Sequence, residues 1–342
     1  MKQLNNAILA LMIFCISLSA KSQDPHLSQI FETPLLRNPS LAGLFKGDIR
    51  LQSVYRSQWG AVTVPYQTTS VSGEYKQKIG NGDDYITFGG QVLYDKAGTV
   101  ALTTLEILPT LNYHKSISAY NNTYLSIGAM GGIIQRGFDR SKMTTNSQFD
   151  GTNYNSSLSD GEYMSKTSYS YFDGSVGMSL NSQIGENPDN NYFVGVAYHH
   201  FNKAKEVSFY ESSNEVILPK WVVSSGMRLS MTDRSYFTLQ ADYTQQGSYT
   251  EIVGGALYSW RLQEEEDSKY LFHVGAYVRW NDAIIPVAKI EFGSIAIATS
   301  YDANISQLKK ATKGQGGFEI SLTYQKAKQN NSSLDAVKCP RF

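Results

Sequence analysis

The chain contains few side chains that are spaced for catalysis or metal binding. Of its five histidines, only His199 and His200 are adjacent. Neighbouring strand residues point to opposite faces, so this pair is not expected to share a metal site. His114 and Ser116 are two residues apart and share a face, but a hydrolase site would also require an orienting Asn or Asp. The sequence therefore favours a protein without a catalytic site.

Residues 264–267, a run of four acidic side chains, are the most obvious candidate for a cation site. A calcium-binding loop spaces its oxygen ligands along a turn. This run is continuous, which is more typical of a solvated turn. We therefore expect neither a metal ion nor a cofactor.

The arginines of the strand-like segments are more informative. Arg50, Arg56 and Arg279 each alternate with apolar residues. If the strands close into a barrel, this alternation places all three on the inner face. There they could line a water-filled pore, pair with interior acids, or hold a plug or partner segment, and the sequence leaves these alternatives open. The candidates for lining the lumen or contacting a partner are Arg50, Arg56, Trp59, Tyr66, Arg279, Arg341 and Phe342.

The segment KYLFHVGAYVRW, residues 269–280, shows the pattern on which this expectation depends. Every second residue from Tyr270 to Trp280 is apolar, and the residues between them include His273 and Arg279. A period of two predicts a strand, and roughly 9 to 11 tilted strand residues cross the hydrocarbon layer of a bilayer. One face of this strand suits lipid and the other suits a polar interior.

Similar alternation recurs along most of the chain. The predicted strand segments, fourteen in number, are 47–57, 66–79, 84–95, 99–115, 122–136, 168–181, 190–201, 220–231, 235–245, 249–262, 269–280, 284–292, 293–303 and 315–326. Tyr and Gly are abundant (23 and 28) and Pro is scarce (9), as is typical of membrane barrels. No apolar run long enough for a membrane helix follows residue 22, but the polar inner face of a barrel hides its spans from a hydropathy scan.

The connections between segments sort by length. Those after even-numbered segments are short (81–84, 118–122, 181–190, 232–235 and 263–268), whereas the long ones (137–167, 202–219 and 304–314) all follow odd-numbered segments. Bacterial outer-membrane barrels have short periplasmic turns and longer outer loops, while a soluble sandwich or propeller has no reason for this sorting. The sequence therefore predicts an all-β fold over residues 47–326: one closed antiparallel transmembrane β-barrel of about 14 strands, of the bacterial outer-membrane type.

The first 22 residues have the features of a signal peptide, with an apolar core followed by Ala20-Lys21-Ser22. Cleavage there would remove Cys15 and leave only Cys339, so we expect no internal disulfide. The whole sequence has 30 basic and 30 acidic residues. Cleavage would also remove Lys2 and Lys21, which leaves 28 basic and 30 acidic residues. This balance gives no indication of nucleic-acid binding.

Residues 23–46 are not strand-like. Pro25, Pro34 and Pro39 interrupt regular structure, but the segment is too apolar for a disordered tail. We expect it to lie in the periplasm or docked in the lumen. Residues 327–342 are expected to form a periplasmic tail that anchors inside or below the barrel, where Arg341 could pair with a lumen carboxylate.

Short motifs at both ends resemble the PorP/SprF family of outer-membrane proteins of Bacteroidota. The start, QDPHLSQ followed by NPSLAG, contains the family positions Asp24, Pro25, Asn38, Pro39 and Gly43, with Ser40 where Ala is usual. The stretches RSQW (56–59) and PYQT (65–68) are also similar to family patterns. Near the end, SYDAN with Asp302 and the closing Cys339-Pro340-Arg341-Phe342 extend the resemblance across the chain.

The resemblance implies an outer-membrane component of the type IX secretion system and, in gliding bacteria, of adhesin export or attachment. It implies a non-enzymatic role: docking the C-terminal domain of a secreted surface protein or adhesin, alongside outer-membrane lipid and possible contacts with other type IX components. The runner-up is a porin-like or substrate-selective transport channel. A barrel hydrolase is the third alternative.

Overall fold

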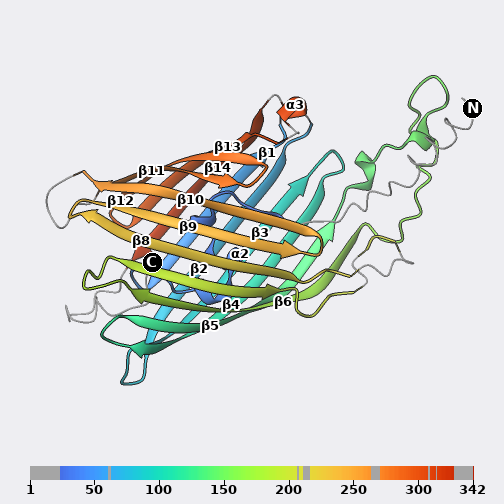
Figure 1. Cartoon of the computed structure of the whole chain (residues 1–342). Coiled ribbons are helices and arrows are strands. Elements are labelled where there is room, and N and C mark those ends of the chain that lie inside the picture. Colours follow the sequence, from blue (N-terminus) through green and yellow to red (C-terminus); the bar gives the residue numbers. More distant parts are fainter. Residues whose placement is uncertain are drawn as a thin grey trace, which may run out of the picture.

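The computed structural model describes residues 24–60, 63–205, 208–210, 216–262, 270–306, 309–312, 314–326 and 342. Within them, fourteen antiparallel strands form a closed barrel in which β1 pairs with both β2 and β14 (Figure 1). The strands are β1 Ile49–Gln58, β2 Tyr66–Ile79, β3 Asp84–Ala97, β4 Leu102–Ser118, β5 Thr123–Gly137, β6 Ser168–Gln183, β7 Asn191–His199, β8 Lys220–Thr232, β9 Ser235–Gln246, β10 Tyr249–Arg261, β11 Tyr270–Arg279, β12 Ala283–Phe292, β13 Ile295–Asn304 and β14 Gln315–Lys326.

The closed 14-strand barrel confirms the predicted fold class, and each strand overlaps the segment predicted for it. The largest shift at a strand start is in β4, which begins at Leu102 rather than at residue 99. The reason is a turn, in which Gly98 and Ala101 both adopt positive φ angles (68° and 49°) that end pairing with β3. No helix in the described ranges is long and apolar enough to span a membrane.

The alternation within strands also follows the prediction. In β11, Tyr270, Val274 and Val278 are exposed on the outer surface, whereas His273 and Arg279 are buried on the inner side. In β1, the inner series includes Arg50 and Arg56, which are 6% and 3% exposed. The barrel therefore presents an apolar outer face to lipid and a polar inner face to the lumen.

The long connections lie at one end of the barrel, which we call the long-loop end. They join β5 to β6, β7 to β8, and β13 to β14, and the β5–β6 connection extends far beyond the strands (Figure 1). Short helices occur here: η3 Arg140–Lys142, η4 Asn146–Gln148 and α3 Lys309–Thr312. At the opposite, short-turn end, β1 begins and β14 ends.

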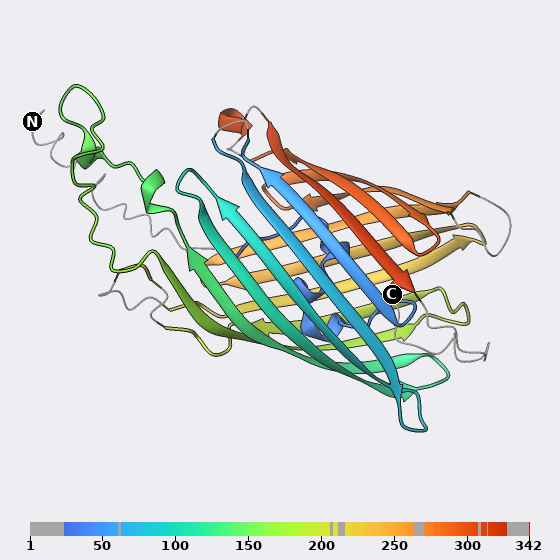
Figure 2. The ribbon, with the colours of Figure 1, turned by 180° about the vertical axis from the view of Figure 1, so that it is seen from behind.

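The lumen is occupied by residues 24–46, which we call the plug segment. It folds into three short helices, η1 Ile30–Glu32, α2 Pro34–Arg37 and η2 Pro39–Leu41, and Figure 2 shows this segment enclosed by the strands. Because Pro34 and Pro39 each begin a helical turn, where the missing N–H of proline is not needed, the sequence favours short turns rather than a strand there. Most plug side chains are buried, including Leu35, Leu41 and Phe45.

Candidate functional site

The plug segment is held near the long-loop end by two buried carboxylates. Glu319 on β14 accepts hydrogen bonds from the backbone amides of Ser28 and Gln29, at 2.6 Å and 2.9 Å. The Ser28 hydroxyl donates to Asp302 Oδ2 on β13 at 2.8 Å. Strand residues therefore satisfy plug amides that have no partner within the plug, which fixes the depth of the segment in the barrel.

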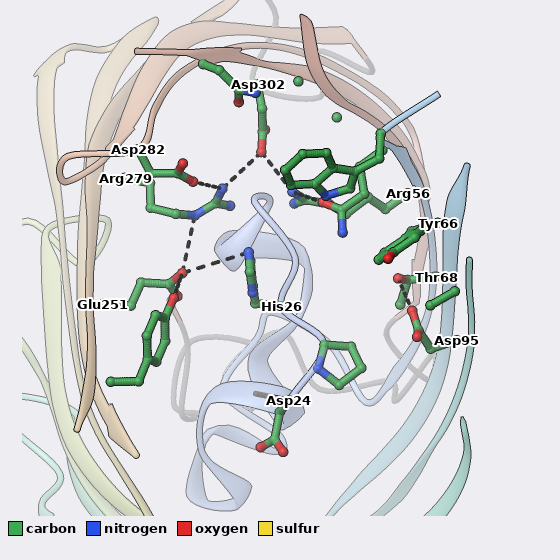
Figure 3. Close-up of a pocket in the computed structure, with 18 of the residues that line it drawn as sticks. Asp24, His26, Arg56, Tyr66, Thr68, Asp95, Glu251, Arg279, Asp282 and Asp302 are labelled. Carbon is green, nitrogen blue, oxygen red and sulfur yellow. Dashed lines mark hydrogen bonds and ion pairs between the residues drawn. The ribbon is translucent and has the colours of Figure 1, made fainter. Parts of the chain in front are cut away.

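Arg56 and Arg279 connect these carboxylates to the neighbouring strands, and Figure 3 shows both arginines directed at Asp302. Arg56 contacts Glu319 at 2.6 Å and Asp302 at 3.0 Å. Arg279 contacts Asp302 at 3.1 Å, and its other partners are Asp282 at 3.1 Å and Glu251 at 3.3 Å. Both arginines also donate to the Ser28 hydroxyl. The sequence left three roles open for the lumen arginines. The observed geometry matches two of them, because both arginines pair with interior acids and both contact the plug segment.

The middle of the plug segment is held by Arg37 and Asn112. Arg37 forms a bidentate ion pair with Asp242 on β9, and both side chains are 7% exposed. The Asn112 amide on β4 donates to the carbonyl oxygens of Ser40 and Ala42, each at 2.7 Å. These contacts tie the turn that begins at Asn38 to opposite sides of the barrel wall.

The short-turn end of the plug segment is held in the same way. Lys289 on β12 pairs with Glu32 at 2.8 Å. The amide of Gly43 donates to Glu74 Oε2 at 2.7 Å, and Arg50 pairs with the same carboxylate. Each part of the plug segment therefore makes at least one contact with a charged side chain of the barrel wall. Paired charges in a region of low dielectric are expensive to separate.

A cavity of about 580 Å³ lies between the plug segment and the long-loop end. We call it the long-loop cavity. Its floor is formed by plug residues from Asp24 to His26, and its walls include Arg56, Arg279 and Asp302. Figure 3 shows these side chains converging on the space above the plug segment. Four aromatic residues also line it: Trp59, Tyr66, Tyr249 and Trp280.

A second cavity, of about 350 Å³, lies at the short-turn end. Phe342 lines it and stacks edge-on against Phe193, with ring centroids 4.6 Å apart. Leu41 and Leu44 of the plug segment belong to the same apolar cluster. Residue 342 therefore packs against the plug segment inside the barrel.

The first described residue, Asp24, belongs to a partly buried charged cluster. Its carboxylate contacts His200 at 2.9 Å and also accepts from Lys220, and His200 contacts Asp173 at 2.9 Å. Burial alone would raise the pKa of Asp24, but Lys220 and His200 hold it well below its usual value. Burial alone would lower the pKa of His200, but Asp24 and Asp173 outweigh burial and raise it to about 9. At neutral pH this cluster is an ionic clamp on the plug segment.

The structure corrects the reasoning about His199 and His200. They were expected on opposite faces, but both are buried, with ring centroids 6.3 Å apart. β7 ends at His199, and His200 adopts a φ of 57°, so strand alternation no longer applies to it. His199 contacts Ser175 and the Arg37 carbonyl oxygen. In the described part of the chain, no group of three or more His, Cys, Asp or Glu side chains could hold a metal ion.

The hydrolase grouping predicted as an alternative is not assembled. His114 Nδ1 lies 2.7 Å from Ser126 Oγ, while the Ser116 amide donates to Asp84. His114 is also fully buried under the plug segment. The acidic run 264–267 lies outside the described residues.

The other predicted site residues that the structure describes fall into two groups. Arg50, Arg56, Trp59, Tyr66, Arg279 and Phe342 line the lumen cavities, and the family-motif positions Asp24, Pro25, Asn38, Pro39, Gly43 and Asp302 lie in the plug segment or contact it. Cys339, Pro340 and Arg341 lie outside the described residues. The sequence reasoning did not identify the carboxylates Glu74, Asp242 and Glu319. Each of these carboxylates alternates with outward-facing residues in its strand, and this alternation could have indicated that all three face the lumen.

Comparison with solved structures finds other bacterial barrels at low sequence identity. The translocator domain of the autotransporter NalP from Neisseria meningitidis is 9% identical, with 94% of this chain and 96% of that chain covered and a TM-score of 0.40. A deltaS2 mutant of the monoaromatic hydrocarbon channel TodX is 10% identical, with 87% and 94% covered and a TM-score of 0.48. The outer membrane protein Omp33 of Acinetobacter baumannii is 7% identical, with 82% and 98% covered and a TM-score of 0.40.

No curated protein sequence gives a significant match. The family model described as type IX secretion system membrane protein PorP/SprF, in contrast, matches residues 19–324. That range includes the plug segment and nearly all of the barrel, and the match agrees with the motifs at Asp24, Asn38 and Asp302. Fold and family together support a place in the outer membrane, and the chain belongs to the PorP/SprF family of type IX secretion system membrane proteins.

Proposed function

We propose that this protein is a non-enzymatic outer-membrane partner of the type IX secretion system. In this proposal it docks the C-terminal domain of an exported surface protein, such as an adhesin, at the cell surface. The observation that carries the proposal is the filled lumen, in which Asp24, Glu32 and Arg37 of residues 24–46 form ion pairs with strand or loop side chains of the barrel. A barrel filled in this way offers binding surfaces at its ends rather than an open water-filled path.

The orientation of the barrel follows from its connections. Outer-membrane barrels have short turns in the periplasm and longer loops outside, so the long-loop end faces the cell surface. Export through a signal peptide in residues 1–22, cleaved before Gln23, is part of the same proposal. The long-loop end is then the surface available to an exported partner.

Two of the long loops pack against each other and expose aromatic side chains. Phe138 packs edge-on against Phe209, with ring centroids 4.8 Å apart, and the Tyr210 hydroxyl donates to Glu162 at 2.7 Å. The β5–β6 and β7–β8 connections are therefore in contact. Tyr154 and Tyr163 remain exposed, at 53% and 93%. Exposed aromatic residues often anchor protein interfaces, so these two are proposed contacts for the partner.

The test is a pull-down of affinity-tagged protein from detergent-solubilised outer membranes of cells that also make type IX substrates. The wild type is expected to recover a secreted surface protein or another type IX component. The double variant Tyr154→Ser, Tyr163→Ser is expected to recover less of it. Tyr120→Ser is the matched control, because Tyr120 is an exposed tyrosine in the turn between β4 and β5 at the opposite end. Repeated recovery of neither class of protein would contradict the proposal.

A transport channel is the second candidate, favoured by the cavities at the two ends of the lumen. Conductance in planar bilayers separates the two functions. The filled wild-type barrel is expected to pass little current, and a variant lacking residues 24–46 is the positive control because it lacks the filling. A wild-type conductance equal to that of the deletion variant would favour transport.

A further inference from the structure

The long-loop cavity carries an excess of negative charge. In its central network, Arg56 and Arg279 face four carboxylates, which are Asp302, Glu319, Glu251 and Asp282. His26 does not offset them, because burial, followed by Arg279 and Arg56, holds its pKa well below the usual value and keeps the ring neutral. Two cations against four anions leave two negative charges in excess.

The charges around this network cancel. Arg136 and Asp95 both line the cavity, one of each sign. Lys220 and His200 balance Asp24 and Asp173 in the adjoining cluster. The excess in the central network is therefore not neutralised by neighbouring residues of the described chain.

A buried oxygen in this network lacks a partner. Asp302 is 2% exposed and lines the cavity. Its Oδ2 accepts from Ser28, Arg56 and Arg279, but its Oδ1 has no hydrogen-bond partner among the described residues. A buried acceptor without a partner destabilises a structure. A donor that reached this oxygen would both satisfy it and reduce the negative excess.

The size and walls of the cavity favour a side chain over a bare ion. Its volume of about 580 Å³ is in the range of pockets that hold small organic ligands. The aromatic residues Trp59, Tyr66, Tyr249 and Trp280 line the same space. Aromatic faces bind guanidinium and ammonium groups and pack against their aliphatic stems. The His, Cys, Asp and Glu side chains described here form no cluster suited to a metal ion.

We infer that the long-loop cavity binds a cationic segment of a partner protein, with an arginine or lysine side chain directed at Asp302, Glu251 and Asp282. The inference rests on the proposed function, because it takes the partner to be the exported protein docked at the long-loop end. It assigns to that docking a specific chemistry, in which a basic partner segment completes an acidic, aromatic-lined cavity.

The test uses purified full-length protein in detergent and a fluorescein-labelled tetra-arginine peptide, followed by fluorescence anisotropy. The wild type is expected to bind this peptide and not a tetraglutamate peptide. The double variant Glu251→Gln, Asp282→Asn should bind about tenfold or more weakly, as expected from the loss of charge-assisted hydrogen bonds. Asp150→Asn is the matched control, because Asp150 is an exposed acid in the β5–β6 loop outside the cavity.

Three results would overturn the inference. The first is no peptide binding by the wild type, and the second is an equal loss of peptide affinity in the double variant and in Asp150→Asn. The third is displacement of the peptide by calcium or magnesium ions from the wild type but not from the double variant. The last result would identify a metal site instead. Heat-modifiable migration in gels checks that the variants remain folded. If the double variant loses the peptide but still recovers the surface protein in a pull-down, the inference fails for the natural partner while the docking function stands.

Discussion

Gly177 on β6 lies directly beneath Asn38 of the plug segment. A Cβ atom at position 177 would overlap the Asn38 amide, and one at its cross-strand partner Gly128 would lie 2.5 Å from the Pro39 carbonyl carbon. Real Cβ atoms do not approach other heavy atoms so closely. The Asn-Pro turn therefore rests on a flat patch of backbone that these two glycines provide, which explains why a turn rather than an extended segment can pass through the lumen here.

Replacing Gly177 by alanine should release the plug segment. We expect Gly177→Ala to raise conductance in planar bilayers toward that of the variant lacking residues 24–46, because the methyl group displaces the Asn38 turn. Gly82→Ala is the control, since a Cβ at position 82 meets open space and Gly82 does not have a positive φ. Identical, low conductance of wild type and Gly177→Ala would show that the turn adjusts without leaving its position.

The fold was predictable because lipid and lumen are such different environments. Each strand must alternate between them, so a segment such as β11 shows its two faces in the sequence, from Tyr270 on one side to Arg279 on the other. The alternation gave the number of strands, and the sorting of long and short connections was an independent check on it. Local pattern alone therefore carried the prediction of a 14-strand barrel.

The site was less predictable because its contacts depend on register and on distant segments. Arg56 and Glu319 are direct cross-strand neighbours, but only after β1 closes against β14 in the observed register. Ser28 meets Glu319 across 291 sequence positions. Alternation indicated that these strand side chains face inward, yet nothing local indicates which of them meet. The error over His200 has a similar origin, since the point where β7 ends decided its direction.

The Arg37–Asp242 pair can be tested by a double-mutant cycle. Arg37→Met or Asp242→Leu alone leaves the other charge buried without its partner, which typically costs about 3–5 kcal/mol. Both changes together replace a buried pair by apolar groups of similar size, which is often close to neutral. We therefore expect each single variant to lower the midpoint of urea unfolding in lipid vesicles more than the double variant does. Additive losses would mean that the two side chains are not coupled.

The clamp at His200 predicts a dependence on alkaline pH. Its pKa of about 9 in the folded protein exceeds the ordinary value of about 6.5, so the folded state binds the proton more tightly than the unfolded state. The stabilisation is therefore complete below about pH 6.5 and is lost as pH rises through about 9. Thermal midpoints should fall more steeply between pH 7 and 10 for the wild type than for His200→Gln.

His26→Gln is the control for that series. Burial and the nearby Arg279 and Arg56 hold the pKa of His26 well below its usual value, so its ring is neutral throughout this range. The slope of its thermal midpoint against pH should match that of the wild type. Equal slopes for all three proteins would exclude His200 as the origin of the alkaline loss.

The outer face predicts a dependence on depth in the membrane. Leu111 lies near the middle of β4 and is exposed on the outer surface, and Ile117 is exposed on the same face one residue before the strand ends. An arginine on the lipid face costs about 2–4 kcal/mol at the bilayer midplane but only about 0–1 kcal/mol near the interface. We therefore expect Leu111→Arg to lower the free energy of unfolding in vesicles by about 2–4 kcal/mol and Ile117→Arg to have little effect. Equal, small effects at both positions would mean that water, and not hydrocarbon, covers this face of β4.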